Sequence, residues 1–253
     1  MYKKLIKSLI FFQTIILCCV KAQNPFIENK GQFPDNVISK TNLPSGVLFM
    51  EKGRFNYVFY NGKQLEEMHK GTSYHNKIET HSYNVTFINH SKNSVFFLFE
   101  PSVFYENYFI GDKKSWADKV RSYKKQVQKD IYEGIDLYLE VQNDKFKSEL
   151  HVGPYKDPEI IKMKYEGLES IQINNGDLIC KTTVNTIIER KPFAYQVINK
   201  KIKKVLCNYK LKNNVLSFDL PNGYDKQYEL IIDPILEFST YSGSNSDNFG
   251  YTA

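Results

Sequence analysis

Apolar and polar side chains alternate with a period of two along much of this chain. In residues 135–141 every odd position is aliphatic, and the even positions carry Asp136, Tyr138 and Glu140. This period places successive side chains on opposite faces of a β-strand, so we expect one face to pack inward and the other to meet solvent. The same pattern predicts strands over residues 46–50, 54–60, 82–88, 95–99, 103–110, 146–152, 215–220 and 228–232.

Turn-forming residues separate these segments into hairpins. Asn175 and Gly176, the pair favoured in type I′ turns, lie between residues 171–173 and 178–180. Residues 143–144 and 199–201 have similar composition and position. Antiparallel hairpins are therefore the predicted building unit.

Helical character is confined to one short segment. Ser115 and Asp118 have the spacing of a capping box, and apolar residues follow at Trp116, Val120 and Tyr123. This segment lies beside a charged stretch that begins at residues 111–112. We predict an all-β fold of two packed antiparallel β-sandwich-like halves, residues 23–111 and 112–234, with one short helix between them, while residues 235–253 look like a separate unit.

The N-terminus has the three-part pattern of a secretory signal peptide. Three lysines within residues 3–7 precede an apolar run over residues 9–20, and Ala22 offers a cleavage site. Cys18 and Cys19 raise the alternative of a lipoprotein signal, but Ile16 and Leu17 provide no small residue before them. We expect cleavage after Ala22, a secreted or outer-surface location, and no membrane span in the mature chain.

Composition and charge limit the classes of partner. The chain has 18 Tyr and 18 Phe and is 42% hydrophobic, which is ample material for a core. Of its 34 basic residues, four lie in residues 1–22, so 30 face 28 acidic residues after cleavage. This near-neutral balance does not support a nucleic-acid partner.

Two cysteines, Cys180 and Cys207, remain after cleavage in a compartment that permits disulfides. A disulfide between them would contribute roughly 3–4 kcal/mol. Two separate buried thiols are the alternative, and the sequence leaves both open because pairing depends on distance in space.

Acidic residues on the strands raise the question of catalysis. Asp136 and Glu140 are about 13 Å apart along one strand, outside the roughly 5–9.5 Å of glycosidase carboxyl pairs. Asp130, Glu133 or Glu149 would supply a closer partner, so a secreted glycan-active hydrolase using Asp136 and Glu149 is an alternative hypothesis. Ordinary solvated charges paired with lysines are the favoured interpretation, and no catalytic residue is assigned.

Metal and cofactor motifs are missing from the sequence. The histidines that lie close together, His69, His75, His81 and His90, follow no ligand motif. Asn245 and Asp247 are too few for a calcium loop. No nucleophile elbow, phosphate loop or dinucleotide fingerprint occurs. We assign no metal and no cofactor.

Surface contacts are expected from aromatic and basic residues. The candidates are Trp116, Tyr138 and the basic run Lys200, Lys201, Lys203 and Lys204. Lysines at a hairpin tip also prevent edge strands from pairing, which is the favoured interpretation of that run. A carbohydrate-binding module, with coplanar exposed aromatics such as Tyr57, Tyr83 and Tyr138, is a third hypothesis.

Five stretches together resemble a known family. They are ENKGQFPDNV (28–37), NYFIGDKKSWADKVRSYKKQVQKDIYEGIDLYLEV (107–141), HVGPYKDPEIIKMKYEGLESIQINNGDL (151–178), KPFAYQ (191–196) and YELIIDP (228–234). In order and spacing they resemble the uncharacterised N-terminal domain that precedes SBBP-type β-propeller repeats in large secreted or cell-surface bacterial proteins of the gliding and adhesion type.

The resemblance extends to the end of the chain. Residues 239–253, STYSGSNSDNFGYTA, are similar to the start of such a repeat, so a fragment or truncated product is expected. The resemblance implies a non-catalytic structural or interaction module whose partners are downstream propeller repeats and a surface glycan or protein. It implies no active site.

Overall fold

The computed structural model describes residues 26–72, 77–142, 145–234 and 236–239. The described residues are mostly β-strand, as the alternation predicts. None of the helices in these ranges is long and apolar enough to cross a membrane. The expected signal peptide, most of the C-terminal unit, His75, Asn245 and Asp247 lie outside the described residues.

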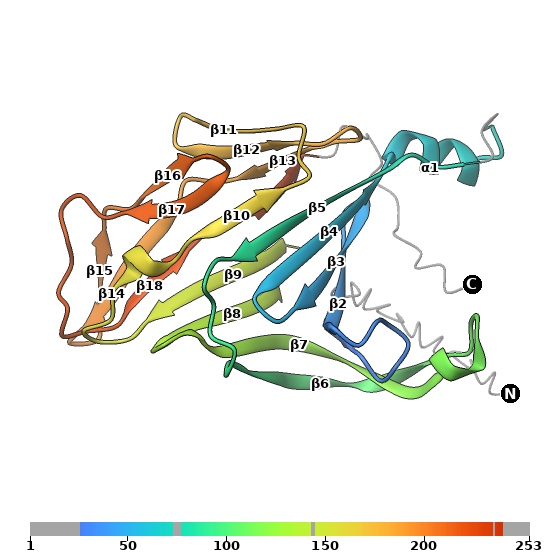
Figure 1. Ribbon diagram of the computed structural model, residues 1–253, viewed down its shortest axis with the longest axis horizontal. Coiled ribbons are helices and arrows are strands. Elements are labelled where there is room, and N and C mark those ends of the chain that lie inside the picture. The colour runs from blue at the N-terminus through green and yellow to red at the C-terminus, as the bar shows by residue number, and fades with distance from the viewer. Residues whose placement is uncertain (1–25, 73–76, 143–144, 235, 240–253) are drawn as a thin grey trace, which may run out of the picture.

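One antiparallel sheet of 15 strands forms most of the molecule (Figure 1). In spatial order its strands are β15 (Lys201–Val205), β14 (Phe193–Ile198), β18 (Leu230–Asp233), β9 (Lys145–Val152), β8 (Ile135–Gln142), β7 (Ala117–Tyr132), β1 (Phe26–Glu28), β2 (Val37–Leu43), β3 (Gly46–Glu51), β4 (Arg54–Tyr60), β5 (Thr80–Phe87), β10 (Met163–Glu166), β17 (Val215–Asp219) and β16 (Asn208–Lys212). The remaining strand, β6 (Val95–Tyr108), pairs with β7.

The sheet folds over so that two layers share one core. Phe146 on β9 meets Phe55 on β4, in the other layer, and Phe26 on the connecting strand β1 edge to face, at ring-centroid distances of 6.5 and 6.3 Å. The two layers join where β1 pairs with both β2 and β7. Because β10, β16 and β17 lie in the same layer as β2–β5, the layers do not follow the two halves of the chain.

These pairings correct the expected arrangement. The mostly-β, antiparallel character is confirmed, but two separate sandwich-like halves are replaced by a single continuous sheet. Strands β1 and β5 pair with β7 and β10, across the boundary expected at residues 111–112. Long-range pairing of this kind has no signature in a local sequence pattern.

A second, four-stranded sheet covers one end of this core (Figure 1). It contains β11 (Ser170–Asn174), β12 (Asp177–Lys181), β13 (Thr186–Glu189) and β19 (Leu236–Ser239). Leu178, Cys180 and Ile187 are its buried contribution to the shared core. The predicted turn at Asn175–Gly176 joins β11 to β12, and both residues have positive φ, as a type I′ turn requires.

The helix prediction near Ser115 is wrong. That segment forms a single 3₁₀ turn, η1 (Lys113–Ser115), and then enters β7. A second 3₁₀ turn in the described part of the chain is η2 (Pro158–Ile160). The α-helix in the described residues is α1 (Gly62–His69), where the Asn61 side chain accepts a hydrogen bond from the Gln64 amide at 3.2 Å. None of its residues is buried, so α1 contributes little to the core.

Candidate interaction surface on the β6–β7 ribbon

Strands β6 and β7 form a long two-stranded ribbon at one margin of the molecule (Figure 1). They have 14 and 16 residues, and pairing runs from Val95–Lys129 to Tyr108–Ala117. Strand β7 also pairs with β1 and β8, whereas β6 pairs with no strand except β7 among the described residues. The ribbon is therefore anchored through β7 and exposed along β6.

A loop around Asn29 is organised by side-chain hydrogen bonds. The Asn29 amide oxygen accepts from the backbone N–H groups of Gly31 at 2.9 Å and Phe33 at 3.2 Å. Its nitrogen donates to the carbonyls of Phe33, Pro34 and Val37. Gln32 bonds back to the Glu28 carbonyl and the Lys30 amide, both at 2.7 Å. The loop thus forms a compact unit that can hold a neighbour in place.

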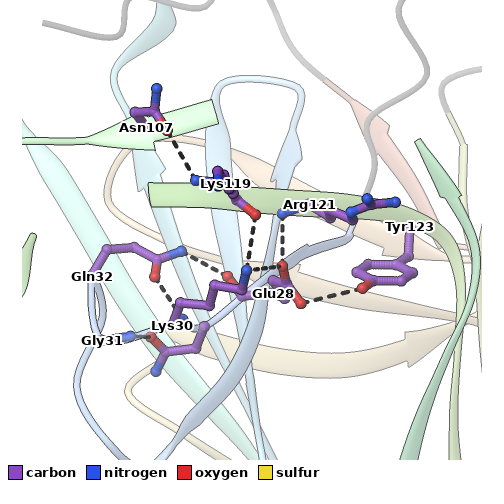
Figure 2. Close-up of polar contacts among 9 residues, drawn as sticks. Glu28, Lys30, Gly31, Gln32, Asn107, Lys119, Arg121 and Tyr123 are labelled. Atoms are coloured by element: carbon purple, nitrogen blue, oxygen red, sulfur yellow. Dashed lines mark hydrogen bonds and ion pairs between the residues drawn. The ribbon is translucent and has the colours of Figure 1, made fainter. Parts of the chain in front are cut away.

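That neighbour is the distal part of β7, as Figure 2 shows. The Glu28 carboxylate accepts hydrogen bonds from the Arg121 backbone N–H at 2.8 Å and from the Tyr123 hydroxyl at 3.2 Å. Lys30 donates to the Lys119 carbonyl at 2.9 Å, and the Lys119 amide donates to Asn107 on β6 at 2.9 Å. Residues 28–32, part of the first stretch of the resemblance, therefore fix the far end of the ribbon.

We call residues 28–32, which hold β7 in this way, the clamp. The part of β6 next to the clamp contains a bulge. Between the pairs Pro101–Tyr123 and Tyr105–Arg121, β6 has two more residues than β7. Extra residues in one strand leave the ladder and bend it. Val103 and Phe104 occupy the bulge and remain 87% and 79% exposed, although both are apolar.

The hairpin tip beyond the bulge carries more exposed apolar side chains. Trp116 is 42% exposed, its ring centroid lies 5.4 Å from that of Phe109, and Lys113 lies over it at 5.9 Å. We define the tip surface as Val103, Phe104, Tyr105, Phe109, Ile110 and Trp116, each of which is exposed. Several exposed apolar side chains on one short stretch of chain make this surface a candidate binding site. Trp116 is the only predicted contact residue within this surface.

Sequence reasoning missed the rest of the tip surface. The alternation predicts residues 103–110 as an ordinary strand with one buried face. The signal available was Glu100-Pro101-Ser102 in the middle of an apolar run, because proline interrupts a strand ladder. Glu100 has a φ of 57°, and the register shift follows at once.

A polar network lies elsewhere, on the outer face of β8, β9 and β18. His151 contacts Glu149 through Nε2 at 3.1 Å and Glu229 through Nδ1 at 3.4 Å. Lys147 contacts Glu149 at 2.6 Å and Asp233 at 3.1 Å. Burial by itself lowers the pKa of His151, but the hydrogen bonds to the two glutamates outweigh burial and raise that pKa to about 9.

This network contains Glu149, one carboxylate of the hydrolase hypothesis, while the other, Asp136, lies beside it with partners of its own. Asp136 and Glu149 are diagonal neighbours on the paired strands β8 and β9. Backbone positions related in this way are roughly 7–8 Å apart. Asp136 is bonded to Lys129 and to the Asp130 amide. The hydrogen bond from His151 lowers the pKa of Glu149, against the effect of burial, to about 2. A glycosidase acid requires the opposite shift. Glu140 lies 3.6 Å from Lys125, and Glu133 lies 2.7 Å from Lys156.

Two hollows among the described residues could hold a substrate only if they were large enough and lined by the right acids. One is an interior cavity of about 40 Å³ between the layers, far below the roughly 300–1,000 Å³ of typical ligand pockets. Its acid, Glu189, accepts a hydrogen bond from Tyr165 at 2.9 Å, and burial raises the pKa of Glu189 to about 7. The other, about 440 Å³, is an open depression whose acid is the exposed Glu133. Neither brings two acids together among its lining residues.

The remaining predicted contact residues lie apart from the tip surface. The predicted lysines form the turn and edge strand β15, where Lys201, Lys203 and Lys204 are exposed. Tyr138 lies on β8, with its ring centroid 4.1 Å from that of His151. Tyr57 and Tyr83 are buried and stacked in the core at 4.8 Å, so they offer no surface platform.

The cysteines and histidines singled out in the sequence also lie outside the tip surface and form no common site among the described residues. Cys180 and Cys207 are free, buried thiols, and burial raises the pKa of both, that of Cys207 to about 12. His81 bonds the Gly167 carbonyl and Thr183, and His90 bonds the Phe87 carbonyl. The described residues contain no cluster of three or more His, Cys, Asp or Glu side chains suited to a metal ion.

Comparison with protein families matches residues 26–235 to the family described as "Domain of unknown function (DUF7948)". The chain belongs to this family. No curated protein and no solved structure matches it. The DUF7948 match covers both layers of the large sheet together with β11, β12 and β13 of the small sheet, and therefore contains the ribbon and its clamp.

Proposed function

We propose that this DUF7948 chain is a non-catalytic, extracytoplasmic interaction module of a secreted or outer-surface protein. It contacts its partner through the tip surface of the β6–β7 ribbon. The partner is the block of SBBP-type β-propeller repeats that the sequence resemblance associates with such domains, and adhesion through a surface glycan or protein is the wider role. Export follows from the signal-peptide pattern of residues 1–22.

One observation carries the proposal: apolar side chains at the ribbon tip are exposed on a backbone that is held in place. Val103 and Phe104 are the most exposed of them, and Glu28 and Lys30 fix the opposite strand through Arg121 and Lys119. Holding a recognition element in its bound shape reduces the entropy lost on binding. Aromatic residues are also enriched among the side chains that dominate interface energies.

Binding of a separately purified block of SBBP-type repeats tests the proposal, with a glycan array run in parallel. The variant Phe104→Ser with Trp116→Ser is expected to weaken binding by about 30-fold or more, the loss typical of hot-spot residues. Ile202→Ser on β15 is the matched control, because Ile202 is also exposed but lies on another strand. Equal binding by the tip variant and the control would contradict the tip surface. Glycan turnover in the same assay would contradict the non-catalytic role.

A further inference from the structure

The exposed edges of the large sheet differ in composition. The terminal strands β15 and β16 carry exposed lysines: Lys201, Lys203 and Lys204 on one, and Lys210 and Lys212 on the other. Charged side chains of this kind keep an edge strand from pairing with another chain. The free edge of β6 has no such protection over residues 95–99, whose sequence is Val-Phe-Phe-Leu-Phe. We call these five residues the edge segment.

The edge segment presents an apolar outer face. Val95, Phe97 and Phe99 are 53%, 45% and 47% exposed, and the rings of the two phenylalanines stack at 6.2 Å. Phe96 and Leu98 point to the other face, where Leu98 packs against the core. Pro101 and the bulge that follows end the regular edge, because they remove a donor and break the ladder. The free, regular part of β6 is therefore limited to this segment.

A second copy of the same segment fits this edge when it runs antiparallel. With the two-fold axis at Phe97, Phe97 faces its equivalent, and Val95 of each copy faces Phe99 of the other. All three exposed apolar positions are then matched on one face, as a self-complementary two-fold contact requires. Moving the two-fold axis by one residue, which is a two-residue shift in register, would place Val95 opposite Pro101 in one direction or Phe99 opposite Asn93 in the other.

Charge at the two ends of the edge segment favours the same arrangement. Lys92 precedes it and is exposed, and Glu100 follows it and is exposed. An antiparallel pair brings the Lys92 end of one copy beside the Glu100 end of the other. Glu100 already lies 3.0 Å from Lys125 on β7, so two basic groups would flank this carboxylate.

We propose that β6 is a self-association edge, through which two copies of this chain pair antiparallel across residues 95–99 and extend the sheet from one copy into the other. A five-residue strand pair is smaller than a standard interface of roughly 1,200 Å² or more. The dimer is therefore expected to exchange with monomer and to increase with concentration.

Disulfide trapping tests the register. With Phe97→Cys, the two introduced thiols face each other, and oxidised glutathione should link two copies about tenfold faster than it links a thiol placed elsewhere on the ribbon. Phe104→Cys is the matched control, because this residue is even more exposed but lies in the bulge. The native Cys180 and Cys207 are buried and should not compete. Val95→Cys should not link to itself, yet should link to a Phe99→Cys copy.

Sedimentation over a concentration series tests association without a covalent trap. The purified chain is expected to show a rising average mass, and Phe97→Lys, which places two like charges opposite each other, should remain monomeric. Phe104→Lys should still associate. A monomer at every attainable concentration, or equal cross-linking of Phe97→Cys and Phe104→Cys, would overturn the proposal. Phe97→Lys leaves the tip surface intact, so failure here is distinguishable from failure of the proposed function.

Discussion

Removal of His151 should change how the stability of this protein depends on pH. Both ring nitrogens of His151 face carboxylates, those of Glu149 and Glu229. Both can donate only when the imidazole is protonated. The ring also lies 4.1 Å from that of Tyr138, a position that favours a cation over an aromatic face. Burial disfavours the charged ring, but these contacts together outweigh burial and stabilise the protonated form of His151.

The magnitude follows from the pKa of His151. It is about 9 in the folded chain, against about 6.5 in an unfolded one. A raised folded pKa gives stability that is fully present below about pH 6.5 and is lost as the pH rises through about 9. At about 1.4 kcal/mol per pKa unit, the loss is on the order of 3 kcal/mol.

Urea unfolding of the wild type and His151→Gln, followed by far-UV circular dichroism at pH 6 and pH 10, measures this loss. Circular dichroism is preferred because Trp116, the single tryptophan, lies on the exposed tip. The difference in unfolding free energy between the two proteins should be larger at pH 6 than at pH 10 by about 3 kcal/mol. Glu189 also titrates in this range, but both proteins retain it and its effect cancels. A difference that does not change with pH would refute the argument.

Two further predictions concern the core and the clamp. Phe146→Ala removes the ring that contacts Phe26 and Phe55 across the layers, so thermal unfolding should show a loss of about 3–5 kcal/mol, and a loss near that of an exposed substitution would contradict the shared core. Asn29→Ala removes the side chain that bonds Gly31, Phe33, Pro34 and Val37, at a cost of about 1–3 kcal/mol. In this variant the Arg121 amide should exchange its hydrogen faster than in the wild type, while the amides of β12 keep their wild-type rates. An unchanged rate at Arg121 would contradict a role of the loop in holding β7.

The helix predicted at the start of β7 is wrong for a specific reason. Trp116, just before β7, and Val120 and Tyr123 within it follow helical spacing. In the structure Lys119 and Asp130 have positive φ, and the pairing register of β7 shifts near both. Such bulges insert residues and break the period of two. The strand exists because β6, β1 and β8 pair with it, which no local window of sequence can report.

The tip surface, too, is only partly predictable from local sequence. The type of Trp116 alone predicts it as a contact residue, while the alternation places Val103, Phe104 and Phe109 on a half-buried strand. Their exposure depends on the bulge and on the clamp from residues 28–32, which are about 90 positions away from Lys119 and Arg121 in the chain. A contact at that separation leaves no periodic signal.

Local sequence is enough to predict the strands whose side chains alternate and the turns whose residues tolerate positive φ. Residues 135–141 have buried odd positions, and Asn175–Gly176 forms the expected turn. These features depend on neighbours within a few residues. The tertiary fold is needed to show that one sheet serves both layers, that the apolar strand β6 lies at an edge of the described sheet, and that the ribbon tip is exposed. Each of these depends on which distant strands pair, since hydrogen bonding between strands is set by packing of the whole core.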